Sequence, residues 1–365
     1  MKLRRVPGPS LHTTLLAAVV AVPALMVVVP TFAQNADPAK VKLGVSEVAK
    51  GISVIEGIEG FAGGNVGVSV GSDGVFIIDD ELEMMSPKLQ AELAKLSKSP
   101  VRFVINTHFH GDHAGGNTAF GSAGAVILAH DNVRVRLSAA ELEKAKDKVV
   151  AKPGVGLPVV TFAQDVTLHL NGDTVHVFHV PPAHTDGDVV VHFTGANVIH
   201  TGDLFLAQGY PFVDMKSGGD FLGFITAADA ILAVSDEKTR IIPGHGAVGG
   251  RAELKAWRDM LEAVRQRVQK LVKQGKTLEQ AIAAKPTADL DAKVSPNFIQ
   301  PDGIVEAAYK SLTAKKPGPP SSAAKAPAAK APAAKPPAAP PPAGKPAQGA
   351  APKPAEPVAP KPTSR

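Results

Sequence analysis

The sequence contains no cysteine, although the chain is 365 residues long. A protein without cysteine has no disulfide bonds, so its folded state must be stabilised by a large hydrophobic core or by bound metal. Residues 46–314 are numerous enough to bury a core of that kind. We therefore expect the folded domain in this part of the chain.

A hydrophobic run long enough for a typical transmembrane helix is also missing near the N-terminus. The apolar run at residues 15–29 is shorter than the about 20 residues that such a helix needs, and Pro23 interrupts it. A basic start precedes the run and the small residue Ala33 follows it, a pattern typical of a cleaved secretory signal peptide. We expect residues 1–33 to be removed and the mature protein to be periplasmic or secreted. An uncleaved membrane anchor is the alternative.

The middle of the chain lacks an excess of positive charge, because the net charge of +5 comes from the two ends. It therefore gives no evidence for nucleic-acid binding. Residues 34–45 are predicted to be a linker. Residues 315–365 consist almost wholly of lysine, proline, alanine and glycine, and a segment with so few apolar side chains is expected to be disordered. This basic tail is either a spacer or a contact for an anionic cell-wall polymer or membrane surface.

Short apolar runs alternate with amphipathic stretches through residues 46–314. The predicted strands cover residues 52–55, 66–70, 75–78, 101–105, 125–128, 166–170, 175–180, 189–193, 197–200 and 240–242. One predicted helix begins at Ser86, and the others cover residues 138–150, 222–234, 252–273, 277–284 and 304–312. Strands come in clusters that helices close. This pattern favours an α/β fold with two facing sheets and helices outside, a four-layer αββα sandwich.

The most informative segment is residues 107–116, which read Thr-His-Phe-His-Gly-Asp-His-Ala-Gly-Gly. Three imidazoles and one carboxylate lie within six residues, on His108, His110, Asp112 and His113. Imidazole nitrogen and carboxylate oxygen are ligands that zinc accepts. A solvated polar loop is the alternative interpretation, but later segments supply further ligands. We therefore interpret the cluster as part of a metal site.

Three more candidate ligands, His184, Asp203 and His245, each follow a predicted strand. Seven ligands are too many for one tetrahedral ion and suit two ions that share a carboxylate. We expect the first zinc ion to bind His108, His110 and His184. The second ion is then expected to bind Asp112, His113 and His245, with Asp203 bridging the two. Two metal ions that share a hydroxide lower its pKa and make it a nucleophile, so that no serine or cysteine is required.

The order His-x-His-x-Asp-His followed by His, Asp and His resembles the metallo-β-lactamase superfamily over about residues 46–314. The resemblance implies the αββα fold, two metal ions and hydrolysis. It also implies that Asp79, at the end of a predicted strand, is a structural aspartate that supports the ligand loop. The presence of both His113 and Asp203 makes the ligand set more similar to glyoxalase II and lactonase enzymes than to true β-lactamases.

These observations predict a metallo-hydrolase that acts on a small-molecule carbonyl substrate. The substrate is an ester, a thioester, a lactone or an amide ring, and a metal-bridging hydroxide cleaves it. Asp112 is the candidate catalytic residue, because it could steady the leaving group or shuttle its proton. Tyr210 and Phe212 are candidate substrate contacts, since they lie in a segment that directly follows a ligand; a packed loop is the alternative there.

Three other functions stay open. The first is β-lactamase activity on β-lactam antibiotics, which is chemically compatible with the predicted site. The second is an iron-dependent enzyme similar to a sulfur dioxygenase, because ligand type does not exclude iron or manganese. The third is a non-catalytic binding protein that is tethered by its basic tail.

Overall fold

The computed structural model describes residues 37–145, 154–292, 294 and 299–314. The predicted signal peptide and the basic tail lie outside the described residues, as do positions 146–150 of one predicted helix. Within the described part of the chain, no helix is both long and apolar enough to cross a membrane.

The first sheet has seven strands in chain order. They are β1 (Lys42–Ala49), β2 (Ile52–Glu59), β3 (Val66–Gly71), β4 (Gly74–Ile78), β5 (Val101–Ile105), β6 (Val126–His130) and β7 (Val160–Phe162). Strands β1 to β4 form an antiparallel meander, whereas β4 to β7 run parallel. Parallel neighbours need crossover connections, and the helices α2 (Ser86–Leu96), α3 (Asn117–Ser122) and α4 (Asp131–Ala145) lie in them. The carboxyl ends of β4 and β5 therefore meet at one edge of the sheet.

The second sheet has six strands in the order β13-β12-β11-β10-β9-β8. They are β8 (Asp165–Leu170), β9 (Asp173–His179), β10 (Val189–Phe193), β11 (Val198–His200), β12 (Arg240–Ile242) and β13 (Gly249–Gly250). All neighbours are antiparallel except β11 and β12. The helices that follow are α5 (Phe221–Ala233), α6 (Arg251–Lys273), α7 (Leu278–Ala283), α8 (Ala288–Asp291) and α9 (Pro301–Thr313). Short 3-10 helices are η1 (Pro38–Lys40), η2 (Glu83–Met85), η3 (Gly202–Leu204) and η4 (Met215–Ser217).

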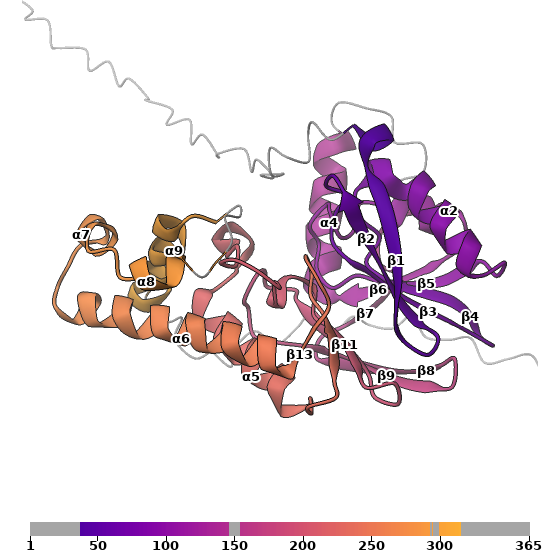
Figure 1. The fold of residues 1–365 in the computed structure, drawn as a ribbon. Helices are drawn as coiled ribbons and strands as arrows, with labels where there is room; N and C mark the ends of the chain where they lie inside the picture. The colour runs from indigo at the N-terminus through magenta and orange to yellow at the C-terminus, as the bar shows by residue number, and fades with distance from the viewer. Residues whose placement is uncertain (1–36, 146–153, 293, 295–298, 315–365) are drawn as a thin grey trace, which may run out of the picture. The chain divides into compact units, whose positions relative to one another are not determined.

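Figure 1 shows the two sheets, with α2 and α4 beside the first and α5 and α6 beside the second. Three apolar layers hold these sheets and helices together. Between the sheets, side chains from both inner faces meet, and the rings of Phe76 and Phe193 stack at 5.7 Å. On the outer face of the first sheet, Ile77 and Val104 pack with Leu89 of α2. The outer face of the second sheet is covered by α5, α6 and α9. Alternate strand residues point to opposite faces, so each sheet is apolar on both sides. The predicted four-layer αββα sandwich is confirmed.

Several elements differ from the expectation. Strands β1, β7 and β13 and helices α3 and α8 lie outside the predicted elements, and α4 begins earlier than predicted. The first strand, β1, begins at Lys42, inside the segment that we predicted to be a linker, and pairs with β2 along its length. Its residues are exposed or half-buried and none is fully buried, so the apolar alternation that marks a strand is weak there. Helix α4 begins at Asp131 rather than at residue 138. The β-branched Val133 opposes a helix by intrinsic preference, but its side chain is fully buried against Gly187, and this packing outweighs the preference.

Candidate metal centre

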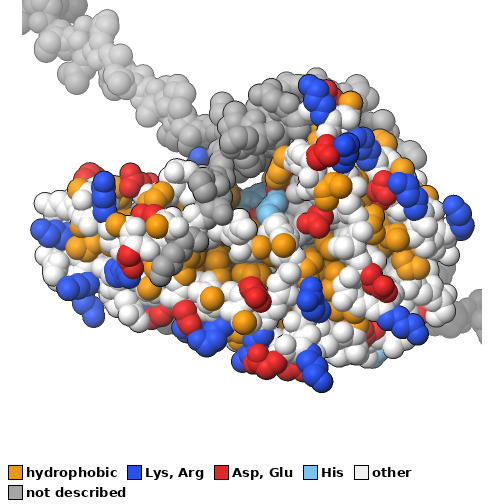
Figure 2. All heavy atoms as spheres, in the orientation of Figure 1, with side chains coloured by type: hydrophobic (Ala, Val, Ile, Leu, Met, Phe, Trp, Pro, Cys, Tyr) orange, Lys and Arg blue, Asp and Glu red, His pale blue; other side chains and the backbone are white. Residues whose placement is uncertain are grey.

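The loops at the carboxyl ends of β5, β9, β11 and β12 bring the seven predicted ligands together. They form two groups without a common residue and a third, of His108, His113 and Asp203, that shares one residue with each. Each loop follows a strand that is anchored in the core, and such loops are placed rigidly while their tips remain accessible. Figure 2 shows histidine atoms at the bottom of a recess in the visible face. His108, His113 and His184 are buried, whereas His110 and His245 are partly exposed.

The first group consists of His108, His110 and His184. The Nε2 atom of His184 lies 3.2 Å from Nε2 of His108 and 2.8 Å from Nδ1 of His110. Two ligands at about 2.0–2.1 Å from one tetrahedral zinc ion are about 3.3 Å apart, so these three nitrogens are spaced much as zinc requires.

The second group consists of Asp112, His113 and His245. The Nε2 atoms of His113 and His245 are 3.2 Å apart. The Oδ2 atom of Asp112 lies 3.5 Å from Nε2 of His245 and 3.9 Å from Nε2 of His113. These distances also suit the ligands of one cation.

Asp203 lies between the two groups and presents one carboxylate oxygen to each. Its Oδ1 atom is 3.2 Å from Nε2 of His113 and 3.5 Å from Nε2 of His245, whereas Oδ2 is 3.4 Å from Nε2 of His184. Although Oδ1 is buried, it forms no hydrogen bond with any described residue. A buried carboxylate oxygen without a partner is costly unless a cation neutralises it. The donor set therefore fits two metal ions that share Asp203.

Hydrogen bonds on the outer side of the cluster orient two imidazoles of the ligand loop. Nδ1 of His113 lies 2.8 Å from Oδ2 of Asp79, and Nδ1 of His108 lies 3.0 Å from Oγ1 of Thr107. The Thr107 hydroxyl in turn donates to Asp79, which also accepts from the Thr107 backbone N–H. Because Nδ1 of each ring donates outward, Nε2 is left unprotonated and faces the cluster. The contacts of Asp79 agree with the supporting role that the resemblance implied.

The other two imidazoles of the first group are held in the same way. Nδ1 of His184 donates to the carbonyl oxygen of Phe212 at 2.7 Å, and Nε2 of His110 donates to Oδ2 of Asp214 at 3.1 Å. The inward-facing nitrogens then carry lone pairs and cannot bond to one another. Such an arrangement is stable when a cation lies between them.

The pKa values of two histidines in the cluster also favour the binding of a cation. Burial lowers the pKa of the His184 imidazole to about 4, so this ring is neutral and able to bind a metal near pH 7. Burial also disfavours the charged form of His113, but the carboxylates of Asp203, Asp112 and Asp79 outweigh it and raise the pKa of His113 well above its ordinary value. The negative potential at this point therefore favours an added positive charge.

The two predicted substrate contacts have different surroundings. Tyr210 is 1% exposed, belongs to the core beneath α5 and α6, and donates from its hydroxyl to Oδ1 of Asp291 at 2.7 Å. Its prediction as a substrate contact is therefore not supported, because packing uses its ring. The ring of Phe212 lies at the edge of the cluster, 6.1 Å from that of His110 and 5.9 Å from that of His184.

Three supporting residues were not among the predicted site residues. Asp214 holds His110, as described above. The ring of Phe61 stacks on that of His245 at 5.8 Å. The side-chain amide of Asn65 donates to the carbonyl oxygens of Pro243 and Gly246 at 2.9 and 2.8 Å, and so clamps the loop that carries His245. The one available signal was the pair of glycines before Asn65, which marks a close turn without revealing its partner.

Comparisons with known proteins agree with this geometry. Residues 60–266 match the sequence model of the metallo-beta-lactamase superfamily, and the match includes all seven candidate ligands. A cluster of histidines and aspartates at the strand ends of an αββα sandwich is typical of metal-dependent enzymes. The chain belongs to the metallo-β-lactamase superfamily and is a metallo-hydrolase that acts on a small-molecule substrate.

Three solved structures are similar in fold. A metallo-beta-lactamase from Pontibacter korlensis is 19% identical with a TM-score of 0.50, and the alignment covers 60% of this chain and 99% of that one. The DIM-1 metallo-beta-lactamase is 20% identical with a TM-score of 0.50, with coverage of 61% and 98%. The stereoselective inverting sec-alkylsulfatase Pisa1 from Pseudomonas sp. is 17% identical with a TM-score of 0.55, with coverage of 73% and 50%. At these identities the likeness concerns the fold alone.

Proposed function

We propose that the protein is a dinuclear zinc hydrolase that cleaves a carbonyl substrate, which is an ester, a thioester, a lactone or an amide ring. The observation that carries the proposal is the position of Asp203, whose two carboxylate oxygens face the two histidine groups. Imidazole and carboxylate ligands with tetrahedral spacing are typical of zinc, although iron and manganese accept the same ligands.

Bound metal would supply an activated hydroxide and would polarise the carbonyl group of the substrate. The residues of the chain have separate roles around it. His108, His110 and His184 are the ligands proposed for one ion, and Asp112, His113 and His245 are those proposed for the other. Asp112 keeps 15% of its side chain exposed. In spite of burial, His113 and His245 lower the pKa of its carboxyl group well below the ordinary value, so Asp112 is a carboxylate that could accept a proton and pass it to the leaving group.

The ligand set favours glyoxalase II-like or lactonase-like chemistry within the superfamily, because both His113 and Asp203 face the cluster. Export to the periplasm or the medium is part of the proposal. It is supported by the signal-like composition of residues 1–33. Contact of the basic tail with an anionic surface is supported only by its lysine content.

Metal analysis and a substrate panel test the proposal. Full-length protein purified without added metal is analysed for zinc, iron and manganese, and then assayed on lactones, thioesters, esters, β-lactams and secondary alkyl sulfates. We expect two zinc ions per chain and activity on a carbonyl substrate that Asp112→Asn reduces at least about 100-fold, a loss typical of a missing general acid. A single iron per chain would replace the proposal with the oxygenase alternative, and turnover of alkyl sulfates alone would refute carbonyl chemistry.

A further inference from the structure

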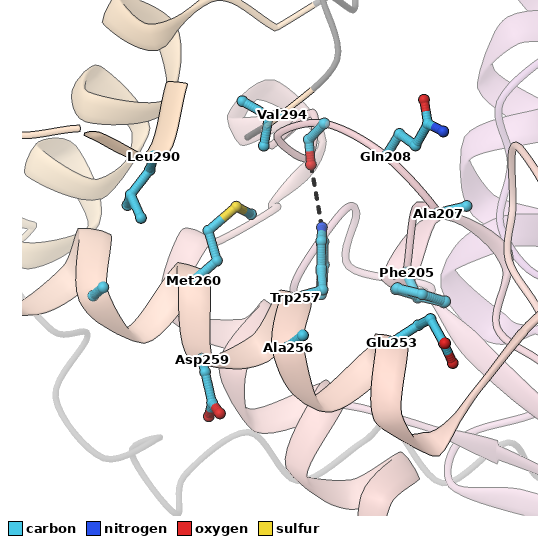
Figure 3. A pocket seen from close by; sticks show the side chains of 12 residues that line it. Phe205, Ala207, Gln208, Glu253, Ala256, Trp257, Asp259, Met260, Leu290 and Val294 are labelled. Atoms are coloured by element: carbon cyan, nitrogen blue, oxygen red, sulfur yellow. Dashed lines mark hydrogen bonds between the residues drawn. The ribbon is translucent and has the colours of Figure 1, made fainter. Parts of the chain in front are cut away.

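A pocket of about 490 Å³ lies beside helix α6, outside the metal centre. One wall is helix α6, another is the segment 205–209, and residues 290 and 294 close the third side (Figure 3). Its volume is within the range of about 300–1,000 Å³ that is usual for small-molecule sites. None of the seven candidate metal ligands lines it.

The interior of the pocket is apolar and its aromatic wall is fixed in place. Phe205, Trp257, Met260 and Leu290 contribute apolar side chains. The indole Nε1–H of Trp257 donates to the carbonyl oxygen of Gly209 at 3.2 Å, the contact drawn as a dashed line in Figure 3. The ring of Trp257 also meets that of Phe205 edge to face at 5.6 Å. A ligand therefore finds a preformed surface and has little side-chain ordering to overcome.

The charges at the pocket restrict the head group of a ligand. No lysine or arginine is among the described residues that line it. Of the two lining carboxylates, that of Asp259 is paired with Lys255 at 2.5 Å and with Arg258 at 3.5 Å, whereas that of Glu253 has no ion-pair partner among the described residues. An anionic head group beside Glu253 would meet like charge, and the described lining residues offer it no basic side chain. A neutral or positively charged head group meets no such cost.

The wall of the pocket is also the support of the metal centre. The carbonyl oxygen of Phe205 accepts from the N–H of Gly244 at 3.2 Å, and the N–H of Ala207 donates to the carbonyl oxygen of His245 at 3.3 Å. Phe205 follows two residues after Asp203. The segment 205–209 thus has the pocket on one side and the loop of a proposed ligand on the other.

We propose that this pocket is a second binding site, which accepts the alkyl chain of an amphiphile whose head group is neutral or cationic. The proposal goes beyond the hydrolase function and does not depend on it. Any ligand that shifts segment 205–209 changes the metal centre as well, and the coupling acts equally in both directions.

The single tryptophan of the chain, Trp257, reports on the pocket directly. Full-length protein is titrated with 1-octanol, octylamine and octanoate while the tryptophan fluorescence is recorded. We expect saturable changes with octanol and octylamine, and at least tenfold weaker binding of octanoate. Along a series from butanol to octanol, each methylene is expected to lower Kd about fourfold, as about 0.8 kcal/mol per buried methylene implies.

Matched variants locate the binding. Ala263→Leu fills the pocket and is expected to weaken octanol binding about tenfold, whereas Ala252→Leu, on an exposed position of the same helix outside the pocket, leaves it unchanged. Ala256→Phe obstructs the exposed edge and serves as a second blocking variant on the surface. Asp112→Asn should lose hydrolysis but keep octanol binding, which separates failure of this proposal from failure of the hydrolase function. No saturable signal with any probe, tightest binding of octanoate, or wild-type affinity in both blocking variants would overturn the proposal.

Discussion

Asp214 and His110 are 104 positions apart in the chain, and Oδ2 of Asp214 accepts a hydrogen bond from Nε2 of His110 at 3.1 Å. The contact fixes which ring nitrogen of His110 carries the proton and turns Nδ1 toward His184. Asp214 is itself held, because its other carboxylate oxygen accepts from the N–H of Ser217 at 3.2 Å. The hydrogen bond to His110 also lowers the pKa of Asp214 despite partial burial, so this carboxylate is ionised at neutral pH.

Replacement of Asp214 by alanine is expected to weaken metal binding at the first group by about 10- to 100-fold, the usual cost of losing such a partner. The reason is that the His110 ring loses its fixed orientation. Competition with a zinc chelator measures the affinity, and the cobalt-substituted protein gives a spectroscopic signature of the altered site. Asp214→Asn keeps an acceptor oxygen and should recover part of the affinity. Equal affinities of wild type and Asp214→Ala would contradict the role.

Gly64 leaves the space that His113 occupies. A Cβ atom on Gly64 would lie 2.1 Å from Cε1 and 2.6 Å from Nε2 of the His113 ring, which is closer than atoms can approach. Gly64→Ala is therefore expected to displace His113 and, if the centre is dinuclear as proposed, to remove the metal held by Asp112, His113 and His245 while the other remains. Gly111→Ala is the matched control, because a Cβ there meets no atom within 4 Å. Metal content by mass spectrometry distinguishes the two, and full metal content in Gly64→Ala would show that the loop adjusts at little cost.

Glu81 makes the stability of the protein depend on pH. Its side chain is fully buried, neither carboxylate oxygen has a hydrogen-bond partner among the described residues, and burial raises the pKa of this group from 4.5 to about 8. Between these pH values the folded protein keeps a proton that the unfolded chain has lost. The free energy of unfolding therefore falls as pH rises, by about 1.4 kcal/mol per pH unit from this group.

Glu81→Gln should remove this part of the pH dependence and make the protein more stable than wild type at pH 8 and above. Urea unfolding at pH 5.5, 7 and 8.5 measures the difference between the two proteins. Glu83→Gln is the control, because Glu83 is a glutamate two residues away whose side chain is exposed. Parallel pH profiles of wild type and Glu81→Gln would contradict the prediction.

Removal of metal is expected to destabilise the fold as well as to abolish activity. Without a cation, Asp79, Asp112 and Asp203 carry like charges close to His113, and Oδ1 of Asp203 lacks a partner. Metal held at 1,000 times its Kd contributes about 4 kcal/mol to the free energy of unfolding. Thermal unfolding with and without a chelator measures the shift in Tm, which added zinc should reverse. The Asp203→Asn variant should respond much less to the chelator.

Much of the fold, and the seven side chains that the structure brings together at the candidate site, could be predicted because their signals are local. Strands such as β4 are continuous apolar runs, and the candidate ligands are of residue types that suit metal. Contacts that depend on tertiary structure gave no such signal. The clamp from Asn65 to Pro243 joins positions 178 residues apart, and an asparagine after two glycines does not show its partner.

Tyr210 and Trp257 show that the sequence does not reveal which aromatic side chains line a cavity. Both are aromatic residues of the helical layer, and position in the chain suggested a substrate role only for Tyr210. The structure buries Tyr210 in the core, whereas Trp257 packs in the same core and also lines the pocket beside α6. The elements that surround an aromatic ring determine whether it lines a cavity. Because these elements lie far apart in the sequence, no local pattern reveals the outcome.

The most direct test of the central claim is an anomalous difference map at the zinc absorption edge, calculated from crystals of the zinc-loaded protein. We predict two peaks per chain. One should lie among His108, His110 and His184 and the other among Asp112, His113 and His245, with a carboxylate oxygen of Asp203 reaching each. A single peak, or peaks that these side chains do not surround, would contradict the dinuclear centre.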